Sequence, residues 1–171
     1  TFEGVDQQAL VETGKALMKA RRVAVIGWRN CYAVALHLRE QLLQLRADVD
    51  VLPHSGQSVA EEIAGLGEGD VAIVVGVRRR PAFFAAVIDA LLAQHVRVAV
   101  IGDLSARAAL VGRDITLFEV ALSSHVLSSF TSAFALAALL VDVVSDQARN
   151  ASTRIRRIND VFGRLGELED C

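Results

Sequence analysis

The sequence has little of several residue types, and each shortage excludes a class of protein. Only two of its 171 residues are cysteines, Cys31 and Cys171, and they do not form a C-x-x-C pair. No disulfide framework, no metal cluster and no other cofactor is therefore expected. So few cysteines favour a reducing, cytoplasmic setting. Proline occurs only 2 times and no low-complexity segment is present, so a disordered tail or a long linker is excluded.

Long apolar runs are also lacking. The longest, residues 130–141, is interrupted by Thr131 and Ser132 and closed by Asp142. It is well short of the ~20 residues that a membrane-spanning helix needs. The first apolar stretch, residues 9–18, contains charged residues and is not a signal peptide. No membrane partner is expected.

Neither charge is in large excess. The formal net charge is −2 and the pI is near 6.1, so this chain lacks the basic character typical of nucleic-acid binding. Lysine is scarce, with Lys15 and Lys19 as its only examples, and the other cations are arginines. Three of these are consecutive, at positions 78–80.

What the chain does contain is aliphatic. Hydrophobic residues make up 53% of the sequence and aromatic residues only 5%, which predicts one compact domain with an Ala, Val, Leu and Ile core. We expect this single domain to span residues 1–171, with a leading helix (1–20), a βα core (21–122) and C-terminal helices (123–168).

Short apolar runs alternate with helical patterns along the core. The expected strands are residues 23–27, 49–52, 71–77, 96–101 and 115–120. The expected helices begin at Asp6, Ala33, Ser58, Pro81 and His125, followed by an amphipathic helix around residues 155–165. This alternation predicts an α/β three-layer sandwich with a doubly wound, five-stranded parallel sheet in the flavodoxin-like order 2-1-3-4-5.

A ligand site is expected where such a sheet sends neighbouring helices to opposite faces, outside the carboxyl ends of its strands. With this strand order, the loops at residues 28–31 and 78–81 flank that point. The first loop is neither a P-loop nor G-x-G-x-x-G. Asn30 and Cys31 lie near a helix N-terminus that favours an anion, with Arg29 beside them. Equally, Asn30 is simply a helix cap.

In the second loop, two of the guanidinium groups of Arg78, Arg79 and Arg80 can face a phosphate or carboxylate, which would offset their repulsion from the helix dipole. The alternative is a solvated cationic loop. Further candidates at this end are His54 and Ser55 after the second strand, and Ser124 and His125 after the last one. Equally, Ser123 or Ser124 caps the last long helix, and the hydroxyls that follow allow close helix packing.

Catalysis is not favoured by the pattern. Proton transfer between sugar carbons needs a poised acid and base, and the candidates are Glu61, Glu62, Glu119, His54 and His125. No spacing forces two of them together, and Glu61 is expected to form a capping box with Ser58. Cys31 has no adjacent histidine to activate it. We therefore expect a protein that is not an enzyme.

The two loops resemble those of the SIS (sugar isomerase) domain found in RpiR-type bacterial transcriptional regulators, and the resemblance covers essentially the whole chain. The first family loop reads G-x-G-x-S-Y-A-x-A and is matched at Gly27, Tyr32, Ala33 and Ala35. Its second glycine and its serine are Arg29 and Cys31 here. The second family loop, S-x-S-R or S-x-S-G-x-T, binds phosphate through its hydroxyls; the serine positions are Gly76 and Arg78 here, followed by Arg79.

This resemblance implies a ligand-sensing and dimerising effector domain that binds a phosphorylated sugar or a related small anion. It implies a homodimer or higher homo-oligomer, and an N-terminal helix-turn-helix domain, missing from this sequence, through which alone DNA would be bound. Two alternatives stay open: a structural dimerisation module without a ligand, and an aldose–ketose sugar-phosphate isomerase. In the last helix, Ile155, Ile158 and Phe162 are expected to pack inward or against a partner, with Arg154, Arg156 and Arg157 solvated.

Overall fold

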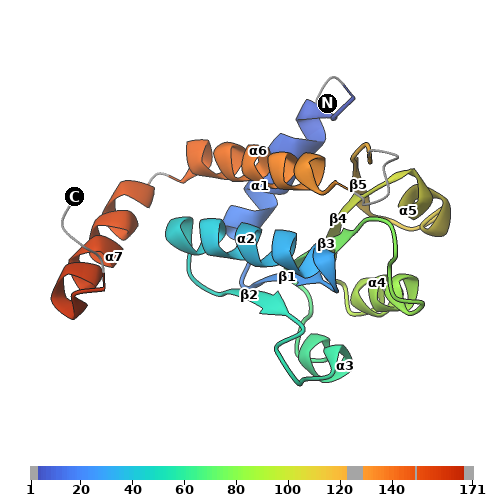
Figure 1. The fold of residues 1–171 in the computed structure, drawn as a ribbon, viewed down its shortest axis with the longest axis horizontal. Coiled ribbons are helices and arrows are strands. Elements are labelled where there is room, and N and C mark those ends of the chain that lie inside the picture. The colour runs from blue at the N-terminus through green and yellow to red at the C-terminus, as the bar shows by residue number, and fades with distance from the viewer. Residues whose placement is uncertain (1–3, 123–128, 149, 168–171) are drawn as a thin grey trace.

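The computed structural model describes residues 4–122, 129–148 and 150–167. Its centre is one parallel sheet with the strand order β2-β1-β3-β4-β5 (Figure 1). The strands are β1 (Val23–Gly27), β2 (Val49–Leu52), β3 (Val71–Gly76), β4 (Arg97–Gly102) and β5 (Thr116–Glu119). The predicted fold class and strand order are confirmed.

The inner strands β1 and β3 are buried along their whole length. Both are nearly continuous runs of aliphatic residues, as is typical of strands covered on both faces. In the parallel register Gly27 lies opposite Val75, and Gly76 opposite Gly102. The carboxyl ends of β1, β3 and β4 therefore end almost level, at one edge of the sheet.

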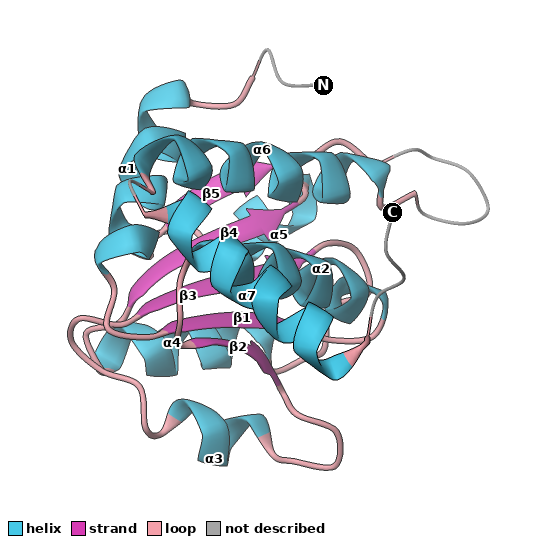
Figure 2. Cartoon of the chain, turned by 90° about the vertical axis from the view of Figure 1, so that its left-hand side faces the viewer, coloured by secondary structure: helices cyan, strands magenta, loops and turns pink. Residues whose placement is uncertain are grey.

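Helices cover both faces of the sheet (Figure 2). One face carries α1 (Gln7–Lys19), α2 (Asn30–Leu45) and α6 (Thr131–Gln147), whose buried side chains form one core cluster. The other carries α3 (Val59–Ile63) and α4 (Phe84–Ala93), with a second cluster that also includes Leu110, which ends α5 (Leu104–Ala109). The face changes between β1, which leads into α2, and β3, which leads into α4, so the expected switch point is present. The last helix, α7 (Ala151–Leu165), lies beside α2 at one end of the molecule.

The expected helix starts are confirmed for α1 but not for α3 and α4. Asp6 caps α1 as predicted and accepts hydrogen bonds from the N–H groups of Gln8 and Ala9. The capping box is wrong, because Ser58 makes no side-chain cap bond to α3. Pro81 is not the first helical residue; its carbonyl accepts the Phe84 N–H in a turn before α4.

The short helix α5 was missed because its six residues carry no amphipathic pattern. The long helix expected from His125 begins at Thr131 within the described residues, and positions 123–128 lie outside them.

In the described part of the chain, no single helix is long and apolar enough to cross a membrane; α6 and α7 together pass on length and composition, but they are bent by 109°.

Candidate functional site at the carboxyl edge of the sheet

Three neighbouring strands end in glycine at the predicted site. A Cβ at Gly27 would lie 2.7 Å from the Cys31 carbonyl oxygen, and one at Gly102 would lie 2.6 Å from the Ala106 Cβ. The helices that follow β1 and β4 thus approach the strand ends too closely for any side chain. The floor of the site is bare backbone, and the loops lie directly above it.

The β1–α2 loop turns on Arg29, which has φ 55° and ψ −129°. A residue with a Cβ rarely adopts a positive φ, and glycine is the usual occupant of such a position. Arg29 is the N-cap residue of α2, whereas Asn30 is its first helical residue. Because α2 has no side-chain cap bond, the interpretation of Asn30 as a simple cap is wrong.

Trp28 and Cys31 connect this loop to the neighbouring β3–α4 loop. The half-buried Trp28 ring meets the Phe83 ring edge-on, with 5.4 Å between centroids. The Cys31 thiol is buried and donates weakly to the Val77 carbonyl at 3.9 Å. Burial raises the pKa of Cys31, so at neutral pH it is held as a thiol, unsuited to nucleophilic attack.

Asp103, which follows β4, organises the β3–α4 loop. Its carboxylate accepts the Arg78 N–H at 3.0 Å, the Ser105 hydroxyl at 2.7 Å and an Arg80 guanidinium N–H at 2.9 Å. It also accepts the Ala106 N–H at 3.0 Å as the cap of α5. Burial by itself raises the pKa of Asp103, but the bonds from Ser105, Ala106 and Arg80 lower it below its usual value.

The three consecutive arginines therefore have different roles. Arg80 is committed to the fold, because it binds Asp103 and the Gly76 carbonyl and lies over the Phe84 ring at 5.3 Å. Arg78 and Arg79 are exposed, and Arg79 has φ 68°.

The two switch-point loops also carry three guanidinium groups without a partner among the described residues. Those of Arg29, Arg78 and Arg79 make no hydrogen bond or ion pair with another described residue. They are available to an anion that approaches the sheet edge from solvent.

The structure brings together two polar candidates that their spacing does not connect. His54 Nδ1 forms a hydrogen bond with the Glu62 carboxylate, which also accepts the His54 N–H at 3.0 Å. Their spacing does not force this contact, as stated above; it arises because the turn after β2 folds back onto α3. Glu119 is instead paired with Arg107 at 2.6 Å.

The remaining candidates are Ser55, Ser124 and His125. Ser55 is exposed next to His54, and Ser124 and His125 lie outside the described residues.

A cavity of about 700 Å³ opens beside Arg78 at the ends of β4 and β5. Arg78, Asp103, Ser105, Glu119 and Leu122 are among its lining residues. A volume of this size is typical of small-molecule sites, which run from ~300 to 1,000 Å³. Asp103 and Ser105 were missed by the sequence reasoning; their signal was an Asp-x-Ser pattern directly after an apolar strand.

Within the described residues no group of three or more His, Cys, Asp or Glu side chains is arranged to hold a metal ion.

No protein-family model matches the chain, and no curated protein matches it. Solved structures do. The sugar isomerase domain of an RpiR transcription factor from Sphaerobacter thermophilus superposes with a TM-score of 0.81 at 22% identity, covering 91% of this chain and 87% of that one. Vibrio vulnificus NanR, complexed with ManNAc-6P, gives 0.79 at 14% identity over 95% of this chain. The match spans 63% of the NanR chain.

Enzymes have the same fold. A phosphoheptose isomerase from Francisella tularensis gives a TM-score of 0.65 at 16% identity, covering 83% of this chain and 87% of that one. The chain therefore has the fold of the sugar isomerase (SIS) domain, which it shares with these three structures.

Proposed function

We propose that this SIS domain is the ligand-sensing and dimerising effector domain of a transcriptional regulator. Its ligand would be a phosphorylated sugar or a related small anion, held between the β1–α2 and β3–α4 loops. One of the similar structures is the sugar isomerase domain of an RpiR transcription factor, and another, NanR, is complexed with the sugar phosphate ManNAc-6P.

The observation that carries the proposal is the pair of arginines at positive φ. Arg29 and Arg79 each hold an unfavourable backbone conformation on one of the two switch-point loops. Such strain costs on the order of 1–3 kcal/mol and clusters at binding or catalytic sites. Asp48 and His95, near the amino edge, also have a positive φ but do not belong to these loops. The guanidinium groups of Arg29 and Arg79 are exposed, unpaired within the described chain and suited to bidentate phosphate contacts.

The absence of the serine hydroxyls of the resembled loop also supports phosphate binding by arginine side chains. At Gly76, where the resembled loop has its first serine, a Cβ would lie 2.1 Å from the Phe84 ring. The Phe84 ring, with Arg80 over it, thus occupies the space of that serine side chain. A phosphate at this edge would be held by arginine side chains in place of hydroxyl groups.

One observation favours a second candidate, a sugar-phosphate isomerase. The His54–Glu62 pair is an acid–base couple at the correct end of the sheet. A coupled aldose–ketose assay tests it: turnover that is lost in both Glu62→Gln and His54→Ala would establish the isomerase. The absence of turnover with every sugar phosphate that binds would reject it.

A thermal-shift panel tests the proposed function. The probes are ManNAc-6P, glucose 6-phosphate, a sugar acid and inorganic phosphate. A ligand that binds only the folded state raises stability by RT ln(1 + [L]/Kd), so a shift that grows with concentration is expected for at least one phosphorylated sugar.

Arg78→Ala and Arg79→Ala should lose most of that shift. The matched control is Arg97→Ala, an exposed arginine at the opposite edge of the sheet, which should keep it. An unchanged shift in both loop variants would contradict the site. No shift with any probe would favour the structural dimerisation module.

A further inference from the structure

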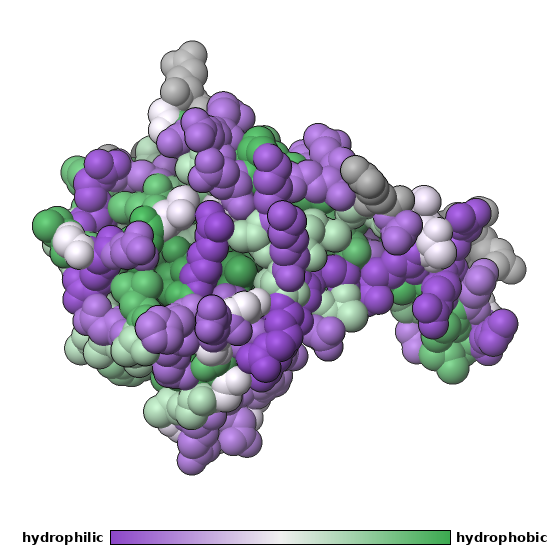
Figure 3. Space-filling model, turned by 180° about the vertical axis from the view of Figure 1, so that it is seen from behind, coloured by the Kyte–Doolittle hydropathy of each residue, from purple (hydrophilic) through white to green (hydrophobic). Residues whose placement is uncertain are grey.

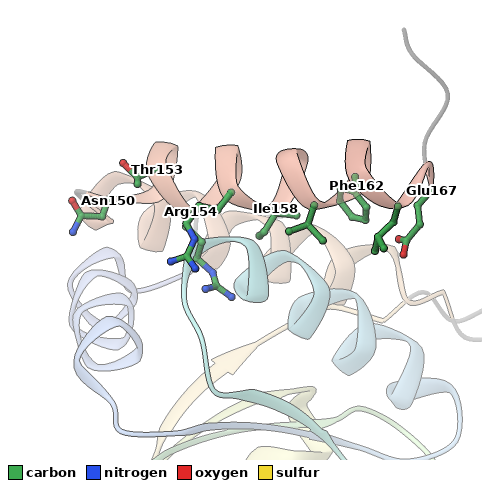
Figure 4. A pocket seen from close by; sticks show the side chains of 9 residues that line it. Asn150, Thr153, Arg154, Ile158, Phe162 and Glu167 are labelled. Atoms are coloured by element: carbon green, nitrogen blue, oxygen red, sulfur yellow. The ribbon is translucent and has the colours of Figure 1, made fainter.

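Two hollows of similar size lie near opposite ends of the molecule, one beside α7 and one beside α5 (Figure 1). The groove beside α7 has about 670 Å³ and a mainly apolar lining that includes Ile158, Val161, Phe162 and Leu165 (Figure 4). Figure 3 shows a green apolar patch on this projecting part among purple side chains. The other hollow is the cavity of about 700 Å³ that Arg78 lines. Of the two, only this cavity adjoins a switch-point loop, so it can receive part of a ligand that is bound there.

Successive residues of the β3–α4 loop are held toward different neighbours. The Val77 carbonyl accepts the Cys31 thiol of α2 at 3.9 Å, on the β1 side. The N–H of the next residue, Arg78, donates to the Asp103 carboxylate at 3.0 Å, on the β4 side. Because β1 and β4 both pair with β3, their ends lie about 10 Å apart at ~4.8 Å per strand. Arg29 and Arg78 therefore follow strand ends on opposite sides of this loop's centre.

The cavity has two carboxylates in its lining, but both have a cationic partner. Asp103 binds the Arg80 guanidinium at 2.9 Å, and Glu119 binds Arg107 at 2.6 Å. The Arg78 guanidinium has no partner among the described residues. Its positive charge is therefore the one that the charged residues of the lining and their ion-pair partners leave uncompensated.

The site as a whole has more positive charge than one phosphate group can neutralise. Arg29, Arg78 and Arg79 contribute three charges, whereas a phosphate monoester has a charge of about −1.5 to −2 at pH 7. The N-termini of α2 and α4 add to the excess, because neither helix has an acidic residue in its first turn or a side-chain cap bond. A ligand with a single phosphate would leave about one cation without a counter-charge.

We propose that the ligand has an anionic group at each end, as a phosphorylated sugar acid or a sugar bisphosphate has. This inference rests on the proposed function and names the ligand class of its site. The phosphate lies between Arg29 and Arg79 at the switch point. The second anionic group lies in the cavity against Arg78, and the sugar chain crosses the end of β3. Arg78 is then the residue that selects doubly anionic ligands.

Calorimetric titration with three open-chain probes tests this selectivity. Glucitol 6-phosphate has one anionic group. At the other end of the same six-carbon chain, 6-phosphogluconate adds a carboxylate and glucitol 1,6-bisphosphate adds a second phosphate. We expect at least one doubly anionic probe to bind about tenfold or more tightly than glucitol 6-phosphate, because a further charge-assisted hydrogen bond contributes that factor. The tighter of the two shows whether the second group is a carboxylate or a phosphate.

Substitutions at the loop and at the opposite edge locate the second group. Arg78→Ala should remove the preference and bring the Kd values of the three probes to within about threefold of one another. Arg78→Lys retains the charge and should keep most of the preference. Arg79→Ala should weaken binding of all three probes but keep the preference, and Arg97→Ala at the amino edge should change neither. Unaltered circular dichroism confirms that the variants are folded.

Equal Kd values for the three probes in the wild type, or a preference that Arg78→Ala leaves unchanged, would overturn the inference. These results differ from a failure of the proposed function. Equal binding of singly and doubly anionic probes leaves the anion site standing without its second subsite. No binding of any phosphorylated compound, in the titrations or in the thermal-shift panel, rejects the anion site itself and this inference with it.

Discussion

The two edges of the sheet use the same residue types in different ways. At the amino edge, the buried Asp70 carboxylate accepts two bonds from the Arg21 guanidinium, at 2.7 and 3.0 Å, and the N–H groups of Arg22 and Gly67. At the carboxyl edge, Asp103 plays the corresponding part for the β3–α4 loop.

The two edges differ in how many of their other arginine side chains have a hydrogen-bond or ion-pair partner. Near the amino edge, the Arg46 guanidinium is bound to the carbonyls of Leu17, Ala47 and Arg21. At the carboxyl edge, Arg80 is bound, whereas the guanidinium groups of Arg29, Arg78 and Arg79 contact no described partner. The amino edge binds the Asp70 carboxylate and the Arg46 guanidinium internally and has exposed Arg97 beside them. The carboxyl edge has three guanidinium groups without a described partner, at the place where this sheet topology binds a ligand.

Removing the carboxylate at the amino edge should have the largest effect on stability. Asp70→Ala leaves the N–H groups of Gly67 and Arg22 without their acceptor in a buried position. We expect a loss of about 3 kcal/mol in the free energy of unfolding, measured by urea denaturation. Anion binding by the folded variant should not change.

The pH dependence of this loss has a defined sign. Burial raises the pKa of Asp70, but the bonds from Arg21 and Gly67 lower it below its usual value. The stabilisation is therefore present above the pKa of the unfolded chain, ~4, and is lost as the pH falls through the lower folded value. The difference in the free energy of unfolding between the wild type and Asp70→Ala should become smaller below about pH 4.

Asp50→Ala serves as the control for this edge. Asp50 forms a looser, half-exposed pair with Arg22 at 3.7 Å. Its removal should cost less than about 0.5 kcal/mol. Equal losses for the two variants would contradict the distinction between the buried carboxylate and the surface pair.

Gly76→Ser restores the hydroxyl of the resembled loop and should have the next largest effect. The added Cβ meets the Phe84 ring at 2.1 Å, so we expect a loss of about 2 kcal/mol from overpacking. Adding Phe84→Leu to this variant should recover part of the loss in denaturation experiments. As a control, Gly163→Ser should leave the free energy of unfolding nearly unchanged, because the space around Gly163 is open. An equally small effect of Gly76→Ser would show that Phe84 does not fill the space beside Gly76.

Arg29→Gly should have the smallest effect on stability, and the effect should be favourable. Glycine adopts the φ of 55° without a Cβ, so the free energy of unfolding should rise by about 1 kcal/mol. The affinity for an anion should fall in the same variant, by calorimetric titration with the best ligand of the panel.

Asp48→Gly is the matched change away from the site. Asp48 has a φ of 57° in the turn after α2, near the amino edge. This variant should gain stability without losing affinity. If Arg29→Gly keeps full affinity, then the strain at Arg29 is not connected with the ligand.

The fold could be predicted from the sequence because the inner strands are continuous apolar runs. The runs from Val23 to Gly27 and from Val71 to Gly76 are too short for a core helix and each ends in glycine, which favours buried parallel strands; they set the switch point.

The site could be predicted only in part, because side-chain partners depend on contacts between distant segments. Arg80 could not be separated from Arg78 and Arg79 before Asp103 was known to lie 23 positions away in sequence but 2.9 Å away in space. The His54–Glu62 pair depends likewise on how the turn after β2 folds back. Nor does the order of residues alone reveal that Phe84 occupies the space beside Gly76.

The central claim is that the unpaired arginines of the carboxyl edge hold an anionic ligand. A crystal of the chain grown with the sugar phosphate that gives the largest thermal shift tests it most directly. The account predicts difference density for the phosphate within hydrogen-bond distance of the Arg29 guanidinium and of Arg78 or Arg79. Phosphate density at another place, or none at a concentration that saturates the thermal shift, would contradict it.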